Sequence, residues 1–179
     1  MKYVAKFEKV SYDQFKKDFI KTIYNEETDI FNTECGDEKL LTIYDNIKLP
    51  TRATTGSAGY DFVSPIVFTL YPTDTILIPT GIRVMIDESW VLKCYPRSGL
   101  GFKYRLQLNN TVGVIDRDYF YSSNEGHIFA KLTNDSKTDS VVTLNAGDAF
   151  MQGIFVEYGI TVDDDVVNIR DGGFGSSGR

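Results

Sequence analysis

The sequence has few of the residues on which several common kinds of functional site depend. It contains one histidine and two cysteines in 179 residues. The single His127 argues against histidine-based metal clusters and against Ser-His triads. Cys35 and Cys94 lie far apart in the sequence, with neither a CxxC pair nor a metal-type spacing. Free thiols of this kind favour a cytoplasmic location, which would be the host cytoplasm if the gene is carried by a phage.

Positive charge and long apolar runs are also scarce. Lysine and arginine number 19 against 25 aspartates and glutamates, so the net charge is −6. An extended nucleic-acid surface needs a basic excess, so we expect no nucleic-acid partner, although a small nucleotide needs only a few local cations. No apolar run approaches the length of a membrane span, and the start MKYVAKFEKV lacks the apolar core of a signal peptide. We therefore expect no membrane association.

The first 47 residues predict a short extension that contains one helix. Ser11 and Gln14 have the spacing of a capping box, and Phe15, Phe19 and Ile23 recur every four residues on one stripe. This pattern predicts a helix over residues 11–24. The acidic stretch NEETDIFNTECGDEK that follows is typical of a solvated connection. We expect the helix to pack on its own domain rather than on a partner.

Residues 48–162 predict an all-β domain. Short β-rich runs alternate there with turn residues, as in TILIPTG and WVLKCYP. In GIRVMID, the apolar Ile82, Val84 and Ile86 alternate with other residues, which is the pattern of a half-buried strand. Many such runs without a long helix between them indicate a jelly-roll-like antiparallel sandwich or barrel. The glycine-rich, acidic residues 163–179 contain few apolar side chains and predict a mobile C-terminal arm.

The most unusual local sequences lie at the turns between strands. They are SAGYDF (57–62), PRSGLG (96–101), NNTVGVIDRDY (109–119) and GDAFMQ (147–152). A guanidinium, a hydroxyl and bare amides at Arg97, Ser98 and Gly99 would suit a phosphate, but the same letters describe an ordinary surface turn. Asp61 and Asp116 could each hold a hydrated Mg²⁺ or orient a water. Taken singly, each is better explained by an Asx-turn or a strand-end cap.

The C-terminal sequence RDGGFGSSGR allows two interpretations. Its composition is that of a flexible linker, yet it carries a phenylalanine between two arginines, which favours an arm that folds over a flat anionic ligand. Residues 173–178 fit GxGxxG, but no βαβ unit surrounds them, so a dinucleotide site fails on context. The sequence also lacks the GxxxxGK[ST] of a P-loop.

Taken together and in order, these segments resemble the five motifs of the trimeric, all-β dUTPases, the deoxyuridine triphosphate nucleotidohydrolases. The matching segments are Ala58–Asp61, Pro96–Gly101, Gly113–Tyr119, Gly147–Asp148 with Gln152, and Arg170 with Gly172–Gly178. The resemblance covers about two thirds of the chain. It implies hydrolysis of dUTP to dUMP and diphosphate with Mg²⁺, by a homotrimer whose active sites lie between subunits. Such an enzyme limits uracil incorporation into DNA and supplies dUMP for dTMP synthesis.

The resemblance also implies a role for particular residues. Asp116 would activate the water that attacks the α-phosphorus, and Asp61 would hold Mg²⁺ through water. The residues implied to bind uracil and deoxyribose are Asn110, Gly113, Ile115, Tyr119 and Phe174. Those implied to bind phosphates are Arg97, Ser98, Gly99, Gln152, Arg170, Gly175 and Ser176. Tyr119 would leave no room for a 2′-hydroxyl, and Phe174 on the closing arm would stack on uracil.

Several positions depart from the family pattern. One residue fewer than usual separates Arg170 from Phe174, and Ala149 stands where arginine is usual. The stretch FYSSNEGHIF after Tyr119 is longer than in the family and predicts an expanded loop. Within it we expect His127 to be a hydrogen-bonded strand residue. The N-terminal extension lies outside the family core, and a regulatory role for it stays open.

Two other functions remain compatible with the sequence. A dCTP deaminase, or a deaminase–hydrolase, would share the same sheet, although the full set of uracil and arm residues, including Phe174, argues against it. A nucleotide-sensing or partner-binding protein of the same fold would keep catalysis secondary. An assay of dCTP separates the first alternative, and the absence of turnover would favour the second.

Overall fold

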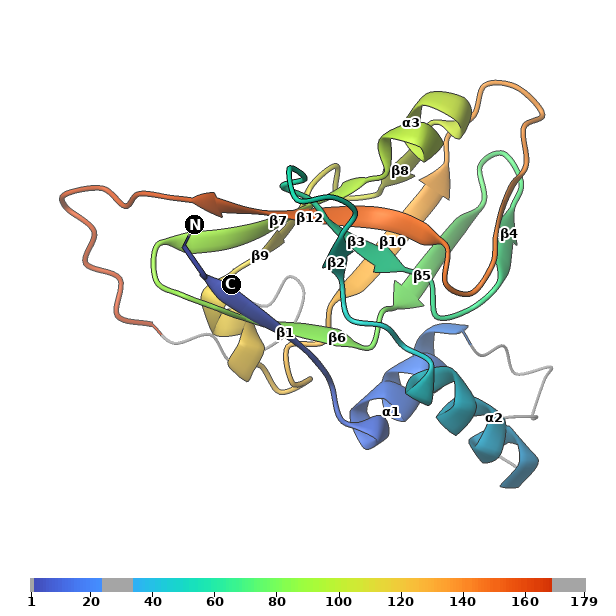
Figure 1. The fold of residues 1–179 in the computed structure, drawn as a ribbon, viewed down its shortest axis with the longest axis horizontal. Coiled ribbons are helices and arrows are strands. Elements are labelled where there is room, and N and C mark those ends of the chain that lie inside the picture. The colour runs from blue at the N-terminus through green and yellow to red at the C-terminus, as the bar shows by residue number, and fades with distance from the viewer. Residues whose placement is uncertain (1, 24–33, 169–179) are drawn as a thin grey trace.

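The chain folds into antiparallel sheets with helices packed against them (Figure 1). The computed structural model describes residues 2–23 and 34–168. Its strands are β1 (Ala5–Lys9), β2 (Thr51–Arg52), β3 (Tyr60–Val63), β4 (Phe68–Leu70), β5 (Thr75–Pro79), β6 (Ile82–Ile86), β7 (Trp90–Pro96), β8 (Leu106–Leu108), β9 (Gly113–Ile115), β10 (Phe129–Asn134), β11 (Val142–Leu144) and β12 (Ala149–Glu157). Its helices are α1 (Tyr12–Ile23), α2 (Glu34–Asp45), α3 (Ser98–Tyr104) and the 3₁₀ helix η2 (Arg117–Tyr121).

The largest sheet has five strands in the order β2-β3-β12-β7-β9. Smaller sheets pair β5-β10-β8, β11-β4 and β1-β6. Each pairing between these described strands is antiparallel. This architecture is the all-β, jelly-roll-like class that the sequence predicts. In the described part of the chain, no helix is long and apolar enough to cross a membrane.

Strand β6 illustrates how the alternation of apolar residues determines which face of a strand is buried. Ile82, Val84 and Ile86 are buried, while Arg83 and Met85 point away from the core, as the alternation predicts. Strand β1 was not predicted, because AKFEK contains one large apolar residue among charged ones. It forms because β6 offers a free edge: Ala5 pairs with Ile86, and Lys9 pairs with Ile82.

Helix α1 confirms the predicted N-terminal helix up to Ile23, and residue 24 lies outside the described residues. Ser11 accepts a hydrogen bond from the backbone N–H of Gln14 at 3.2 Å, which is the first half of the predicted capping box. The second half is not made by Gln14. Its place is taken by Glu125, which accepts bonds from the Ser11 backbone N–H at 2.7 Å and from the Ser11 hydroxyl at 2.6 Å.

The predicted solvated connection over residues 25–39 was wrong in its second part, where α2 begins at Glu34. Residues 25–33 lie outside the described residues. Leu40 of α2 is fully buried, and the ring of Tyr44 lies 5.5 Å from that of Tyr12. The Lys9 ammonium donates to the carbonyls of Tyr44 and Asp45 at 2.9 and 3.0 Å, which caps the helix end. Tertiary contacts therefore stabilise a helix whose own sequence is acidic and weakly patterned.

The hydrophobic core is shared between the strands and the N-terminal helices. Phe15 and Phe19 of α1 and Leu40 of α2 belong to the same buried cluster as Ile78 of β5. Figure 1 shows α1 and α2 side by side beneath the sheets. The predicted packing of the helix on its own domain is confirmed. At the other end, residues 163–168 of the predicted arm are exposed and form no helix or strand.

Replacing Phe15 tests whether α1 is part of this core. Phe15→Ala removes a fully buried ring, so we expect it to lower the free energy of unfolding by about 3–5 kcal/mol. Urea denaturation at a fixed chain concentration measures the change. The matched control is Lys17→Ala on the solvent face of α1, which should change stability by less than about 0.5 kcal/mol. Equal effects of the two substitutions would contradict a core role for α1.

Candidate active site

Strand β12 aligns one group of the predicted site residues. Gln152 on β12 lies opposite Asp61 on β3 and opposite Tyr95 on β7. A Cβ atom at Gly59 would lie 2.7 Å from the Gln152 side-chain oxygen, so glycine lets this side chain approach the backbone just before β3. The Gln152 amide also donates to the Pro96 carbonyl at 3.4 Å. The register thus brings the first and fourth motifs together.

Arg97 joins this group from the end of β7. Its backbone N–H donates to the Phe150 carbonyl at 3.1 Å, and its Nη1 donates to Asp61 Oδ2 in a half-exposed ion pair. Ser98 and Gly99 follow and are exposed. The sequence predicted a turn here, but these residues begin α3, and Arg105 follows the last residue of this helix in a left-handed conformation. We call Asp61, Arg97 and Gln152 the β12 cluster.

A second group of predicted residues lines a cavity of about 650 Å³. Asn110, Gly113 and Ile115 belong to its wall, in and after the turn that leads into β9. Gly113 pairs with Cys94, and a Cβ atom at Gly113 would lie 3.1 Å from the Cys94 Cβ atom. Glycine therefore keeps this side of the cavity open, since any side chain would press on the neighbouring strand.

Asp116 directly precedes η2, and Tyr119 lies within it. Asp116 is half-buried at the start of η2, and its carbonyl accepts from the Tyr119 backbone N–H at 3.2 Å. Tyr119 is 3% exposed. Its hydroxyl donates to the His127 carbonyl at 2.7 Å and accepts from the Asn124 amide at 2.8 Å. His127 is buried and hydrogen-bonded as predicted, but it precedes β10 instead of lying within a strand.

The β12 cluster and Asp116 lie far apart within one chain. Strands β3 and β9 are separated by β12 and β7, so the lateral distance is three strand spacings, or about 14 Å. Asp61 and Asp116 are also offset along the strand direction. Asp61 is level with Tyr95 of β7 through Gln152, whereas Ile115, the residue before Asp116, pairs with Leu92 of β7. Asp116 therefore lies four residues along the strand from the level of Asp61. That offset adds about 13 Å, which gives a separation of about 19 Å in an ideal sheet. The two groups of one chain therefore cannot contact the same phosphate.

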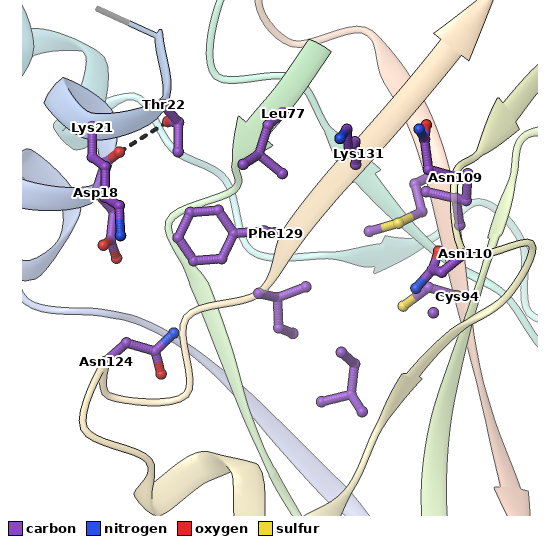
Figure 2. Close-up of a pocket in the computed structure, with 15 residues that line it drawn as sticks. Asp18, Lys21, Thr22, Leu77, Cys94, Asn109, Asn110, Asn124, Phe129 and Lys131 are labelled. Carbon is purple, nitrogen blue, oxygen red and sulfur yellow. Dashed lines mark hydrogen bonds between the residues drawn. The ribbon is translucent and has the colours of Figure 1, made fainter. Parts of the chain in front are cut away.

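The cavity also has walls that the sequence did not predict. Asp18, Lys21 and Thr22 of α1 line it from one side, and Lys131 of β10 lies between them and Asn110 (Figure 2). A signal existed for Asp18, since it lies on the same helical face as Phe15 and Phe19. A carboxylate on an apolar stripe indicates a buried partner. The identity of that partner, His127, depends on the fold.

The remaining predicted site residues cannot be placed. Arg170, Phe174, Gly175 and Ser176 lie outside the described residues. Their implied contacts with uracil and the γ-phosphate stay predictions from the fifth motif.

The chain matches known proteins over the range that contains the β12 cluster, the predicted residues that line the cavity, and Asp116. The family model described as dUTPase matches residues 45–178. The deoxyuridine 5′-triphosphate nucleotidohydrolase of Lactococcus lactis is 38% identical over 145 residues, which cover 78% of this chain and 95% of that protein. The protein of the same name from Escherichia coli K12 is 40% identical over 139 residues, covering 73% of this chain and 87% of that one.

Solved structures agree with the fold. A dUTPase from Streptococcus mutans is 39% identical with a TM-score of 0.56, covering 65% of this chain and 90% of that chain. The dUTPase of phage phi11 of S. aureus is 24% identical with a TM-score of 0.56, covering 69% and 92%, and this likeness concerns the fold alone. The matched family range begins after α1 and most of α2.

The thiol of Cys94 offers a test of the cavity wall. Burial raises the pKa of Cys94 to about 12, so the thiol stays protonated and unreactive at pH 8. In a Cys35→Ser variant, we expect Ellman's reagent to label the folded chain no faster than it unfolds. Labelling should be complete within the mixing time in urea. Rapid stoichiometric labelling in native buffer would contradict the closed packing of Cys94 against Gly113.

Proposed function

The chain belongs to the dUTPase family, and from this premise we propose that it hydrolyses dUTP to dUMP and diphosphate. The observation that carries the proposal is the match over residues 45–178, which contains all five motifs. The spatial grouping of Asp61, Arg97 and Gln152 supports it, because these residues come from three separate motifs. Such an enzyme would limit uracil incorporation into DNA and supply dUMP for dTMP synthesis, in the cytoplasm of its cell or of a phage host.

The β12 cluster is the phosphate-binding part of the proposed site. Arg97 offers a guanidinium fork for phosphate oxygens, Gln152 offers an amide, and Ser98 and Gly99 offer an exposed hydroxyl and open backbone. Before substrate binds, the Asp61 carboxylate orients the Arg97 guanidinium. A bound triphosphate would compete with Asp61 for the Arg97 guanidinium, which would leave the Asp61 carboxylate available to hold a metal ion.

The residues present fit a hydrated Mg²⁺. Among residues 2–23 and 34–168, no three His, Cys, Asp or Glu side chains are grouped so as to hold a metal ion directly. Mg²⁺ commonly keeps several waters and is bound by one or two carboxylates together with substrate phosphates. Asp61 would be the carboxylate, through water. When bound, Mg²⁺ neutralises charge on the triphosphate and favours departure of diphosphate.

Asp116 is the proposed base. It would accept a proton from a water whose oxygen attacks the α-phosphorus, while the bond to the oxygen bridging the α- and β-phosphorus breaks. The cavity beside it would take uracil against Asn110, Gly113 and Ile115, and Tyr119 would lie against the deoxyribose. A tight fit at that sugar rejects a 2′-hydroxyl by overpacking. Phosphoryl transfer of this kind depends mainly on positioning and charge neutralisation.

The separation within one chain supports a site built from more than one chain. A water activated by Asp116 must lie within hydrogen-bond reach of it, whereas the β12 cluster of the same chain is about 19 Å away. The β12 cluster of one chain would therefore act with Asp116 and the cavity of another. The homotrimer implied by the family supplies this arrangement. The fifth motif, with Arg170, Phe174, Gly175 and Ser176, would close over the nucleotide.

Diphosphate release from four nucleotides tests the reaction. With Mg²⁺ present, we expect turnover of dUTP and far less of dCTP, dTTP and UTP. A chain that ends at Ile169 lacks the proposed closing segment, so its dUTP turnover should fall by about 100-fold or more. Unchanged dUTP turnover by the shortened chain would show that this segment has no role in the reaction. Preference for dCTP would favour the deaminase-type alternative, and no turnover by the intact chain would favour a binding protein.

Mixing two inactive variants tests the shared site. We expect Asp116→Asn and Arg97→Ala to be inactive alone, because each removes one half of every site. In randomly mixed trimers, about a quarter of the sites would combine an intact Asp116 with an intact Arg97, so activity should reappear after co-refolding.

The matched control combines Arg97→Ala with Asp61→Asn. Both residues belong to the β12 cluster of one chain, so no mixture restores a complete cluster. Recovery in the control as strong as in the test mixture would contradict the proposed division between chains.

A further inference from the structure

The two regions that depart from the family pattern contact each other. Helix α1 lies before residue 45, where the family match begins, and the expanded loop follows Tyr119. The loop, residues 122–128, is bound by α1 at two points. Glu125 of the loop accepts hydrogen bonds from Ser11 at the start of α1. His127 of the loop is hydrogen-bonded to Asp18 in the middle of α1. An extension and an enlarged loop that bond to each other suggest one shared role.

Asp18 and His127 form a buried, directed hydrogen bond. The distance from His127 Nδ1 to Asp18 Oδ2 is 2.7 Å, and the two side chains are 0% and 10% exposed. His127 Nε2 lies 2.8 Å from the Gly81 backbone nitrogen, which can only donate. Nε2 is therefore an acceptor, and the proton of the neutral ring lies on Nδ1 and is donated to Asp18.

The Asp18 carboxylate is held in its ionised form. Burial works to raise the pKa of Asp18, but hydrogen bonds from His127 and Gln14 outweigh it and hold the pKa below its usual range. Gln14 donates to the same oxygen at 2.7 Å. At neutral pH, Asp18 is thus a fixed acceptor that sets both the tautomer and the orientation of His127.

His127 in turn holds Tyr119. Its carbonyl accepts the Tyr119 hydroxyl proton at 2.7 Å, and its backbone N–H donates to the Asn124 carbonyl at 3.1 Å. The Asn124 amide completes the set by donating to the Tyr119 oxygen at 2.8 Å. Both the donor and the acceptor capacity of this hydroxyl are used by the loop.

The loop also packs directly on the backbone of η2. Gly126 has a φ of +71°, and a Cβ atom there would lie 2.7 Å from Phe120 Cα and 2.8 Å from the Tyr119 carbonyl oxygen. Only glycine permits this contact. A shift of the loop is therefore transmitted to η2, which carries Tyr119 and begins beside Asp116.

We propose that Asp18 is a positioning residue for sugar selection, acting through His127 on Tyr119. This role rests on the proposed function, in which Tyr119 lies against the deoxyribose and excludes a 2′-hydroxyl. Helix α1 thereby takes part in substrate discrimination through the expanded loop. Its side chains need not touch the nucleotide for this effect.

The ratio of kcat/KM for dUTP to kcat/KM for UTP is the readout. A purely structural loss lowers the amount of folded enzyme and reduces both values equally, which leaves the ratio unchanged. Asp18→Ala removes the acceptor of His127 and should lower the ratio by about tenfold, the worth of one buried hydrogen bond. Asp18→Asn keeps an oxygen acceptor at the same place and should retain most of the selectivity.

The matched control is Tyr12→Phe. It removes a 2.6 Å hydrogen bond from α1 to Asp37 without touching the loop, so the ratio should not change. If Asp18→Ala fails to fold, Asn124→Ala takes its place, because it removes a bond to the Tyr119 hydroxyl without altering α1. It should lower the ratio in the same direction.

The outcomes separate this inference from the proposed function. A wild-type chain that does not hydrolyse dUTP would overturn the proposed function and the positioning role with it. A selective wild-type chain whose ratio survives in Asp18→Ala, or in Asn124→Ala, would overturn the positioning role alone. Equal losses in Asp18→Ala and Asp18→Asn would also overturn it, because the hydrogen bond would then not be the cause.

Discussion

The pairing of β12 with both β3 and β7 is the constraint on which the rest of the site depends. Its register places Gln152 opposite Asp61 and opposite Tyr95, two residues before Arg97. A slip of one residue would turn each of these side chains to the other face of the sheet. The Asp61–Arg97 ion pair forms because this register brings the start of β3 close to the end of β7. The ion pair holds the Arg97 guanidinium where the triphosphate is proposed to bind.

The same sheet also keeps Asp116 away from the Arg97 guanidinium. Strands β12 and β7 lie between β3 and β9, so one chain holds its β12 cluster and its Asp116 at separate places. The proposed reaction needs both groups at one dUTP, so under that proposal a second chain would complete the site. The N-terminal helices add to this frame, since α1 shares the core through Phe15 and Phe19 and holds the loop behind η2.

The sequence predicts features that depend on neighbouring residues, and it does not predict features that depend on contacts between residues far apart in the chain. The segments around Asp61, Arg97 and Gly113 were recognisable because glycine and charged residues stand at fixed short spacings, although Arg97 precedes helix α3 and not the predicted turn. Helix α2 was missed because its stability comes from the burial of Leu40 and the cap by Lys9, which no local pattern reveals. The Asp18–His127 bond joins residues 109 positions apart, so only the fold could identify it.

The mass of the active species tests the central claim, a site shared between chains, most directly. Sedimentation of the intact protein, combined with specific activity over a dilution series, relates assembly to turnover. The account predicts a species of three times the chain mass, whose activity per chain falls as dilution dissociates it. A monomer with full activity at every concentration would contradict it, because one chain would then hold a complete site.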